Sequence, residues 1–91
     1  MAVIIKIPHM FRQFIDDAKE ISVGPGTISE IINEVKKKYP DLAKQILDNK
    51  GHIKGHLKLC INSGFINNPS EYLQIVGDEQ ILKLIIPITG G

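Results

Sequence analysis

The sequence predicts an α+β fold in which one main helix packs on one face of a small mixed sheet. Alternating β-branched residues over residues 3–7 predict a strand near the N-terminus. A capped segment that begins at Thr27 carries apolar residues at helical spacing. The nearly continuous apolar run from Ile81 to Ile86 predicts a strand at the centre of the sheet. An amphipathic helix buries its apolar side by lying across such a sheet.

The composition is that of one folded domain. With 91 residues, 43% of them hydrophobic and 23% charged, residues 1–91 are expected to form a single domain. A net charge of +1 and an aromatic content of 5% without tryptophan disfavour nucleic-acid binding. No run reaches the roughly 20 apolar residues of a membrane span, and no charged leader is present, so we expect a cytoplasmic protein with no membrane partner. The single cysteine, Cys60, excludes an internal disulfide.

The first two strands are expected to pair as a hairpin. The strand over residues 3–7 has apolar side chains on one face and ends at Pro8. A second alternating run spans residues 19–23 and is closed by Gly24-Pro25-Gly26. The connection between the strands is long and partly apolar, and the residues that we expect to pack inward from it are Met10, Phe11, Phe14 and Ile15.

The helix is marked by a capping box, because Thr27 is followed three positions later by Glu30. The residues expected to face the core from this helix are Ile28, Ile31, Ile32, Val35 and Tyr39. Lys36-Lys37-Lys38 near its end could steer an acidic partner or could be an ordinary solvated face. Pro40 breaks the pattern, and residues 41–48 predict a short second helix.

The second half of the sequence predicts three further strands. An alternating run over residues 57–61 ends at the turn Asn62-Ser63-Gly64 and leads into a short return strand at Phe65-Ile66. The segments expected between strands are a surface loop over residues 49–55, an irregular stretch or helical turn over 72–76, and a turn at Gly77-Asp78. The order is therefore β-β-α-(α)-β-β-β. Pairing of the first strand with the last would centre both apolar runs, which is the β-grasp, or ubiquitin-like, arrangement.

The last five residues are Pro87-Ile88-Thr89-Gly90-Gly91, which we expect to protrude as a tail over residues 87–91. A carboxylate on two glycines could enter a channel too narrow for any Cβ, although a frayed terminus rich in small residues is an equally open interpretation. Pro87 ends strand pairing because it lacks an N–H, and it would also direct the tail away from the sheet. Ile88 and Thr89 could then lie extended in a partner's groove.

The β-grasp order followed by Gly-Gly resembles the ubiquitin-like sulfur carriers, the MoaD/ThiS family of the molybdopterin synthase small subunit and the thiamine-pathway carrier. The last five residues look like the family's Pro-Val-Ser-Gly-Gly ending. Gly77-Asp78-Glu79 looks like its Gly-Asp-Glu turn, and Asn62 looks like the asparagine that opens its hairpin.

The resemblance implies a carrier protein and not an enzyme. An E1-like adenylyltransferase would adenylate Gly91 with ATP and magnesium, and sulfur would then displace AMP to leave a thiocarboxylate. The carrier itself would bind no cofactor. The length and the second helix resemble the molybdopterin or cysteine branch more than the thiamine branch, and the molybdopterin synthase large subunit or another sulfur-accepting enzyme would be the partner. A modifier conjugated to lysines through Gly91 and a plain interaction module with an inert tail remain alternatives.

One face of the predicted sheet is left without a helix. If the apolar residues of the strand over 57–61 face the helix, Cys60 points to the opposite face together with Ile4 and Ile85. Such an apolar patch marks a partner site, and we predict that the activating enzyme docks there unless residues 8–18 or a second copy cover it. Cys60 is favoured as a half-buried strand residue over a reactive nucleophile, because no flanking pattern indicates a lowered pKa.

A metal site is not expected. His52, His56 and Cys60 are spaced by four residues, which on one helix would align three ligands. Gly51 and Gly55 argue against that helix, so ordinary loop histidines are favoured.

Overall fold

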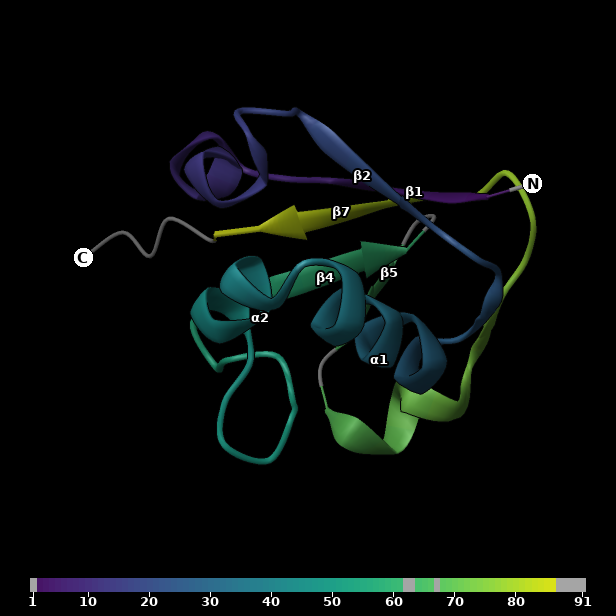
Figure 1. Cartoon of the computed structure of the whole chain (residues 1–91). Helices are drawn as coiled ribbons and strands as arrows, with labels where there is room; N and C mark the ends of the chain where they lie inside the picture. The colour runs from purple at the N-terminus through teal and green to yellow at the C-terminus, as the bar shows by residue number, and fades with distance from the viewer. Residues whose placement is uncertain (1, 62–63, 67, 87–91) are drawn as a thin grey trace.

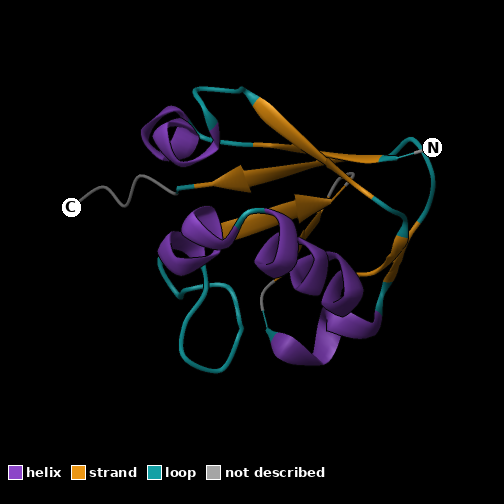
Figure 2. Ribbon diagram, in the orientation of Figure 1, coloured by secondary structure: helices purple, strands orange, loops and turns teal. Residues whose placement is uncertain are grey.

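The computed structural model describes residues 2–61, 64–66 and 68–86. Its main sheet has five strands in the order β2-β1-β7-β4-β5, and two α-helices lie on one side of it (Figures 1 and 2). A separate two-stranded sheet pairs β3 with β6. The mixed sheet with helices packed on one face confirms the predicted α+β, β-grasp fold.

The centre of the sheet is formed by the first and the last strand. β1 (Val3–Lys6) runs parallel to β7 (Ile81–Ile85), with Ile5 opposite Leu82. β2 (Glu20–Val23) pairs antiparallel with β1 on its other side. The predicted hairpin and the predicted pairing of the first strand with the last are both confirmed.

The other half of the sheet is an antiparallel hairpin. β4 (Lys58–Ile61) pairs with β7, and β5 (Gly64–Ile66) forms the edge beside β4. Asn62 and Ser63, in the predicted turn between them, lie outside the residues that the structure describes. Since β7 has a strand on each side, it is the central strand predicted from its apolar run.

The main helix, α1 (Ile28–Lys38), begins at the predicted capping box. The Thr27 hydroxyl accepts a hydrogen bond from the Glu30 N–H at 3.1 Å, and the Glu30 carboxylate accepts one from the Thr27 N–H at 2.8 Å. Two backbone amides without a helical partner are thereby satisfied. The residues that α1 buries against the sheet are Ile28, Ile31, Ile32 and Val35.

Glu34 links α1 to the end of β2 and also pairs with a lysine in the last turn of α1. Its carboxylate accepts a hydrogen bond from the Gly24 N–H at 2.9 Å and forms an ion pair with Lys38 at 2.8 Å. The contact with Lys38, followed by that with Gly24, lowers the pKa of Glu34. The end of α1 is therefore held over the end of β2.

The second helix, α2 (Pro40–Ile46), starts with proline in its first turn, where the missing N–H removes no helical hydrogen bond. It buries Leu42, Ala43 and Ile46 and confirms the short helix predicted over residues 41–48. The loop that follows it returns to β4, as predicted.

The connection between β1 and β2 forms a 3-10 helix, η1 (His9–Ile15). Phe11 and Ile15 are buried and Phe14 is partly buried, as predicted. Met10 is 57% exposed, so its predicted inward packing is wrong. A 3-10 helix has three residues per turn, so the face that contains Phe11 and Phe14 leaves Met10 on the outer side.

The small second sheet was not predicted. It pairs β3 (Gly26–Thr27) with β6 (Ile75–Val76), which follows a second 3-10 helix, η2 (Pro69–Leu73). The sequence allowed an irregular stretch or a helical turn over residues 72–76, and η2 includes only residues 72–73 of that stretch, since Ile75 and Val76 form β6. Strands of two residues have no measurable alternation, so their pairing left no signal in the sequence.

The core lies between the helices and the sheet. Every buried side chain in the described part of the chain is hydrophobic, including Leu42, Val76 and Leu82, which are fully inaccessible. Phe11 and Ile15 of η1 extend the same cluster at one end.

Candidate functional site

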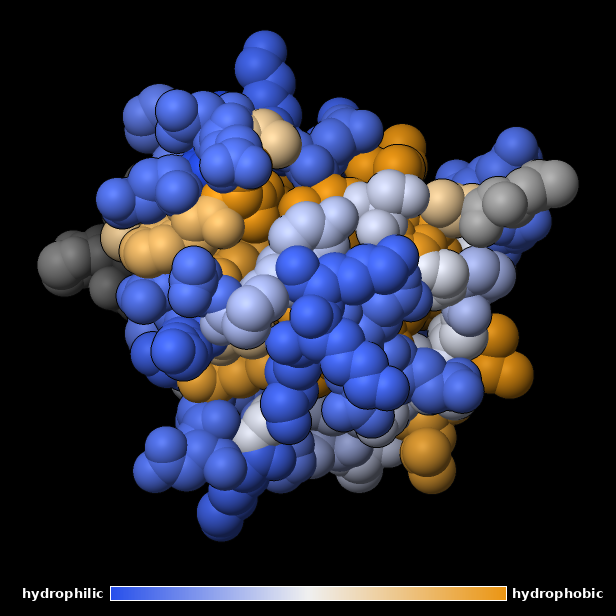
Figure 3. Space-filling model, viewed as in Figure 1, coloured by the Kyte–Doolittle hydropathy of each residue, from blue (hydrophilic) through white to orange (hydrophobic). Residues whose placement is uncertain are grey.

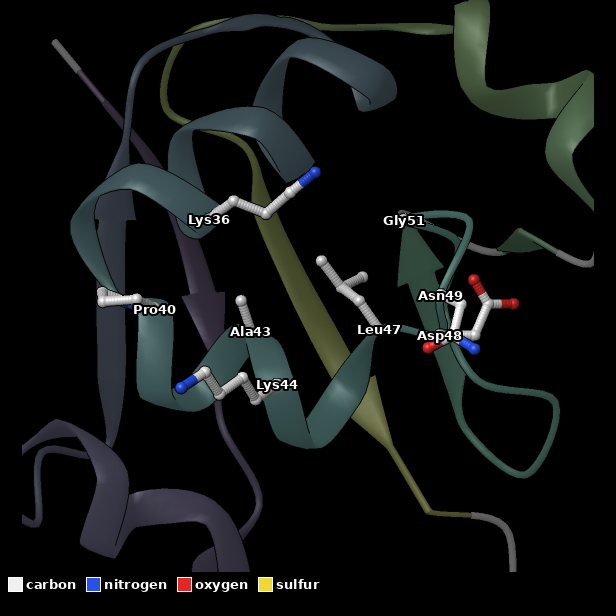
Figure 4. Close-up of a pocket in the computed structure, with 8 residues that line it drawn as sticks. All are labelled: Lys36, Pro40, Ala43, Lys44, Leu47, Asp48, Asn49 and Gly51. Carbon is white, nitrogen blue, oxygen red and sulfur yellow. The ribbon is translucent and has the colours of Figure 1, made fainter.

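The central strand leads directly to the predicted reactive terminus. Pro87, Ile88, Thr89, Gly90 and Gly91 lie outside the residues that the structure describes. β7 ends at Ile85, and its carboxyl end emerges beside α2 in both views (Figures 1 and 4). Because β7 is hydrogen-bonded to a strand on each side, the segment after it begins from a rigid base.

The two faces of the five-stranded sheet differ in what covers them. Along β7, Leu82 and Leu84 are buried under the helices, while Ile81, Lys83 and Ile85 alternate with them and point to the other side. Both helices lie on the same side of the sheet in Figure 2. We call the side away from the helices the open face, and its residues are Ile4, Lys6, Glu20, Ser22, Lys58, Cys60, Phe65, Ile81, Lys83 and Ile85.

The strand register brings the open-face residues together in rows. Lys83 lies opposite Lys6 on β1 and opposite Cys60 on β4, and Cys60 lies opposite Phe65 on β5. A neighbouring row places Ile4 opposite Ile81. A third row places Ile85 opposite Lys58. The register thus puts the predicted residues Ile4, Cys60 and Ile85 on one face, as the alternation required.

The open face combines apolar surface with positive charge. Ile81 and Phe65 are 50% and 52% exposed, while Ile4, Cys60 and Ile85 are half-buried. Lys6 forms an ion pair with Glu20 of β2 at 3.1 Å. Such a surface can contact a partner that presents apolar side chains surrounded by carboxylates.

Two of the apolar open-face residues were not singled out from the sequence. Ile81 is in phase with Ile85, but the continuous apolar run over residues 81–86 hid the alternation. Phe65 joins the face only because β5 pairs with β4 so that it lies opposite Cys60. The period-two phase could have found Ile81, whereas Phe65 required the strand register.

The connection over residues 8–18 packs elsewhere. η1 contacts α2, and its buried side chains join the core on the helix side. It leaves Ile81 and Phe65 half exposed, so it does not cover the open face. A second copy of the chain remains as an alternative cover.

The predicted loop histidines do not form a metal centre. Among the residues that the structure describes, no three histidine, cysteine or acidic side chains are close enough together to hold a metal ion. His52 instead stands edge-on to Tyr72, with ring centroids 5.6 Å apart, and Cys60 is a half-buried residue of β4. Within the same residues, each helix is too short or too polar to span a membrane.

Comparison with known proteins finds the same fold among solved structures. No protein-family model and no curated protein matches the sequence. CysO from Mycobacterium tuberculosis is similar with a TM-score of 0.80 and 15% identity, over 94% of this chain and 99% of that chain. A chain of the Amycolatopsis orientalis BexX/CysO complex is similar with a TM-score of 0.82 and 19% identity, and the match covers 99% of this chain and 100% of that chain.

An archaeal protein has the same arrangement. SAMP1 from Haloferax volcanii is similar with a TM-score of 0.77 and 15% identity, and the match covers 100% of both chains. Small archaeal modifier protein 1 from Methanosarcina acetivorans is similar with a TM-score of 0.75 and 20% identity, and the match covers 99% of this chain and 96% of that chain. At these identities the likeness establishes the fold, and it confirms the resemblance inferred from the sequence at that level.

Proposed function

We propose that this chain is a ubiquitin-like sulfur carrier of the MoaD/ThiS type. Its Gly91 carboxylate would be adenylated by an E1-like enzyme and converted to a thiocarboxylate that donates sulfur in a biosynthetic reaction. One observation carries the proposal: the central strand of a β-grasp sheet runs directly into Pro87-Ile88-Thr89-Gly90-Gly91. The proposal takes Gly91 as the terminal residue of the active form.

The chemistry explains why two proteins are needed. A carboxylate is a poor acyl donor, so one Gly91 oxygen would attack the α-phosphate of ATP in the partner and release pyrophosphate. Sulfide would then attack the carbonyl carbon of the acyl adenylate, AMP would leave, and a proton would be lost to solvent. The product is a thiocarboxylate, a sulfur nucleophile at neutral pH. ATP and magnesium belong to the partner, and the carrier performs no catalysis alone.

The residues around the terminus would have separate roles. Gly90 and Gly91 would pass through a narrow channel because neither has a Cβ. Pro87 would end strand pairing, and Ile88 with Thr89 would lie extended in the partner's groove. The open face, including Ile4, Cys60 and Ile85, would dock the activating enzyme. That a protein of this fold is known in a BexX/CysO complex supports a role in docking to partners.

The acceptor that we favour is the molybdopterin synthase large subunit, which the tail would enter to complete an enzyme. The second helix and the length of 91 residues support this branch or the cysteine branch over the thiamine branch. Identifying the proteins that co-purify with the intact chain would decide between the molybdopterin and cysteine branches. A pterin synthase subunit would indicate the first branch, and a cysteine synthase would indicate the second.

Intact-mass spectrometry tests the proposal. The chain would be incubated with ATP, magnesium, sulfide and its cognate activating enzyme, and its mass should rise by the difference between sulfur and oxygen. The matched control carries one extra residue after Gly91 and should show no change. An unchanged mass in the presence of an enzyme that consumes ATP on other carriers would overturn the proposal.

A ubiquitin-like modifier is the second candidate, favoured by the similarity to small archaeal modifier protein 1. In that case the same adenylate would be attacked by a lysine amine of another protein, and an isopeptide bond would form with loss of AMP. Blots of lysates should then show high-mass species that vanish when Gly91 is deleted.

A further inference from the structure

The helix side of the molecule carries a cavity of about 380 Å³ between α1, α2 and the loop after α2 (Figure 4). Ala43 and Leu47 form its apolar floor. The exposed Lys36 of α1 and Lys44 of α2 reach from different helices on either side of Ala43. The cavity is thus apolar at its base and basic at its rim.

A second hollow, of about 290 Å³, adjoins the first. The two share Lys36 and Gly51, and the second is also lined by Lys50 and by Leu73 of η2. We call the two adjoining hollows together the basic groove, defined by Lys36, Lys44, Lys50, Gly51 and Leu73. Figure 3 shows this side of the molecule, with hydrophilic side chains over its centre and hydrophobic ones exposed towards its edges.

Among the described residues, the lysines of the groove are not held in ion pairs, although the charge of Lys50 attracts that of Asp48. In the part of the chain that the structure describes, none of Lys36, Lys44 and Lys50 forms an ion pair with a carboxylate. Of the residues that the structure describes, Asp48 is the only acidic one that lines either hollow. Its carboxylate accepts hydrogen bonds from the backbone N–H groups of His52 at 3.0 Å and Lys50 at 2.8 Å. These bonds lower the pKa of Asp48, and the bond from His52 has the largest effect. The negative charge of Asp48 is thereby stabilised by the backbone of its own loop.

The wall of the groove is fixed before any ligand arrives. The N–H of Ile53 donates to the hydroxyl oxygen of the buried Tyr72 at 2.9 Å, and Leu47 and Ile53 form an isolated β-bridge. Gly51 has a φ of 79°, and a Cβ placed on it would lie 3.7 Å from the Lys36 ammonium nitrogen. A preformed wall reduces the entropy that binding would cost.

We propose that the basic groove binds an acidic peptide segment of a partner protein, in which carboxylates alternate with apolar side chains. Three lysines spaced along the groove fit several carboxylates in a row better than one small anion. Leu73, at the end of the groove, is 77% exposed and offers an apolar contact. The groove lies on the opposite side of the sheet from the open face, so both surfaces can be occupied together. This inference does not depend on the chemistry of Gly91.

Fluorescence anisotropy of a labelled peptide tests the inference. The probe is Asp-Glu-Leu-Asp-Glu-Leu-Asp-Glu, and its control has Asn and Gln in place of the acidic residues. The full chain should bind the acidic probe and not the neutral one, and binding should weaken as salt is added. The double variant Lys36→Glu with Lys44→Glu should weaken binding about tenfold or more, since it replaces two attractive contacts by repulsive ones.

Two further variants separate this site from a general charge effect. Lys19→Glu makes the same charge change for one residue on the connection before β2 and should alter affinity by less than about twofold. Leu73→Ser should weaken binding about threefold through the lost apolar contact. Thermal melts of each variant show whether the chain is still folded.

Three outcomes would overturn the inference. The first is equal loss of affinity in Lys19→Glu and in the single variant Lys36→Glu. The second is equal binding of the neutral peptide. The third is displacement of the probe by inorganic phosphate or ATP at concentrations comparable to that of the probe, which would indicate a small-anion site. Deletion of Gly90 and Gly91 should leave probe binding intact, so failure of the sulfur-carrier proposal would be seen separately.

Discussion

The two faces of the five-stranded sheet are made by the same strands and have opposite characters. On β7, Leu82 and Leu84 are almost inaccessible under the helices, whereas Ile81 and Lys83 beside them are exposed on the open face. The covered face is uniformly apolar, whereas the open face mixes apolar side chains with three lysines, Glu20 and Ser22. The residues of β7 on the covered face therefore stabilise the core, while those on the open face are available to contact a partner.

This comparison separates two kinds of effect. Substitutions on the covered face should change the free energy of unfolding, because they leave cavities in a packed core. Substitutions on the open face should change the affinity for a partner while the chain stays folded. Four predictions test this division, from the largest expected effect to the smallest.

The largest effect is expected from Leu82→Ala on the covered face. Leu82 is completely buried, so its truncation should lower the free energy of unfolding by about 2–5 kcal/mol. Its neighbour Lys83 is exposed, and Lys83→Ala should change the free energy of unfolding by no more than about 0.5 kcal/mol. Urea denaturation of both variants measures the difference. Similar losses in the two would show that the faces are not energetically distinct.

The next effect concerns recognition by the open face. Phe65→Ser and Ile81→Ser remove half-exposed apolar groups, and each should weaken binding of the cognate adenylyltransferase about tenfold, or ~1.4 kcal/mol. The free energy of unfolding should fall by less than about 1 kcal/mol, because much of each side chain is already in water. Isothermal titration calorimetry measures the affinity. Undiminished binding would place the docking surface elsewhere.

A smaller effect should follow from Thr27→Ala, which removes the cap that fixes α1 over the covered face. Loss of the hydrogen bond to the Glu30 N–H should cost about 1 kcal/mol of unfolding free energy. Thr27→Ser keeps the accepting hydroxyl and should retain most of that stability. Chemical denaturation monitored by circular dichroism compares the two, and equal losses would contradict the capping role.

The smallest effect is the pH response of the loop bordering the helix side. Hydrogen bonds from His52 and Lys50 lower the pKa of Asp48 below its ordinary value of 3.8. Asp48 therefore contributes its stability fully above pH 3.8 and loses it as the pH falls through the lowered pKa. An NMR titration of the carboxyl carbon should give this lowered value. A value at or above 3.8 would show that the loop does not hold the carboxylate in solution.

Much of the fold followed from local patterns. The capping box at Thr27 and Glu30 specified where α1 begins, because its hydrogen bonds join residues three positions apart. The apolar run over residues 81–86 indicated a central strand, and β7 is indeed paired on both edges, although only Leu82 and Leu84 are buried under the helices. The 3-10 form of η1 and the outward position of Met10 were missed, because a single short helix has too few turns to define a face.

The candidate site divides in the same way. The alternation along each strand placed Ile4, Cys60 and Ile85 on one face, and the structure agrees. Phe65 was missed, because its place beside Cys60 depends on how β5 pairs with β4. The basic groove was missed as well, since its lysines come from α1, α2 and the following loop, and only packing brings these segments together.

The sequence by itself determined the strands of the main sheet, the two α-helices and their order, the cap of α1, the inward and outward faces of the strands and the Gly90-Gly91 pair on which the proposed chemistry depends. Each of these depends on residues that are neighbours along the chain or recur at a fixed period. The tertiary structure alone decided the strand register, the position of Phe65 opposite Cys60 on the open face and the assembly of the basic groove. Those features join residues that are distant in sequence, and their contacts are set by the packing of the whole core.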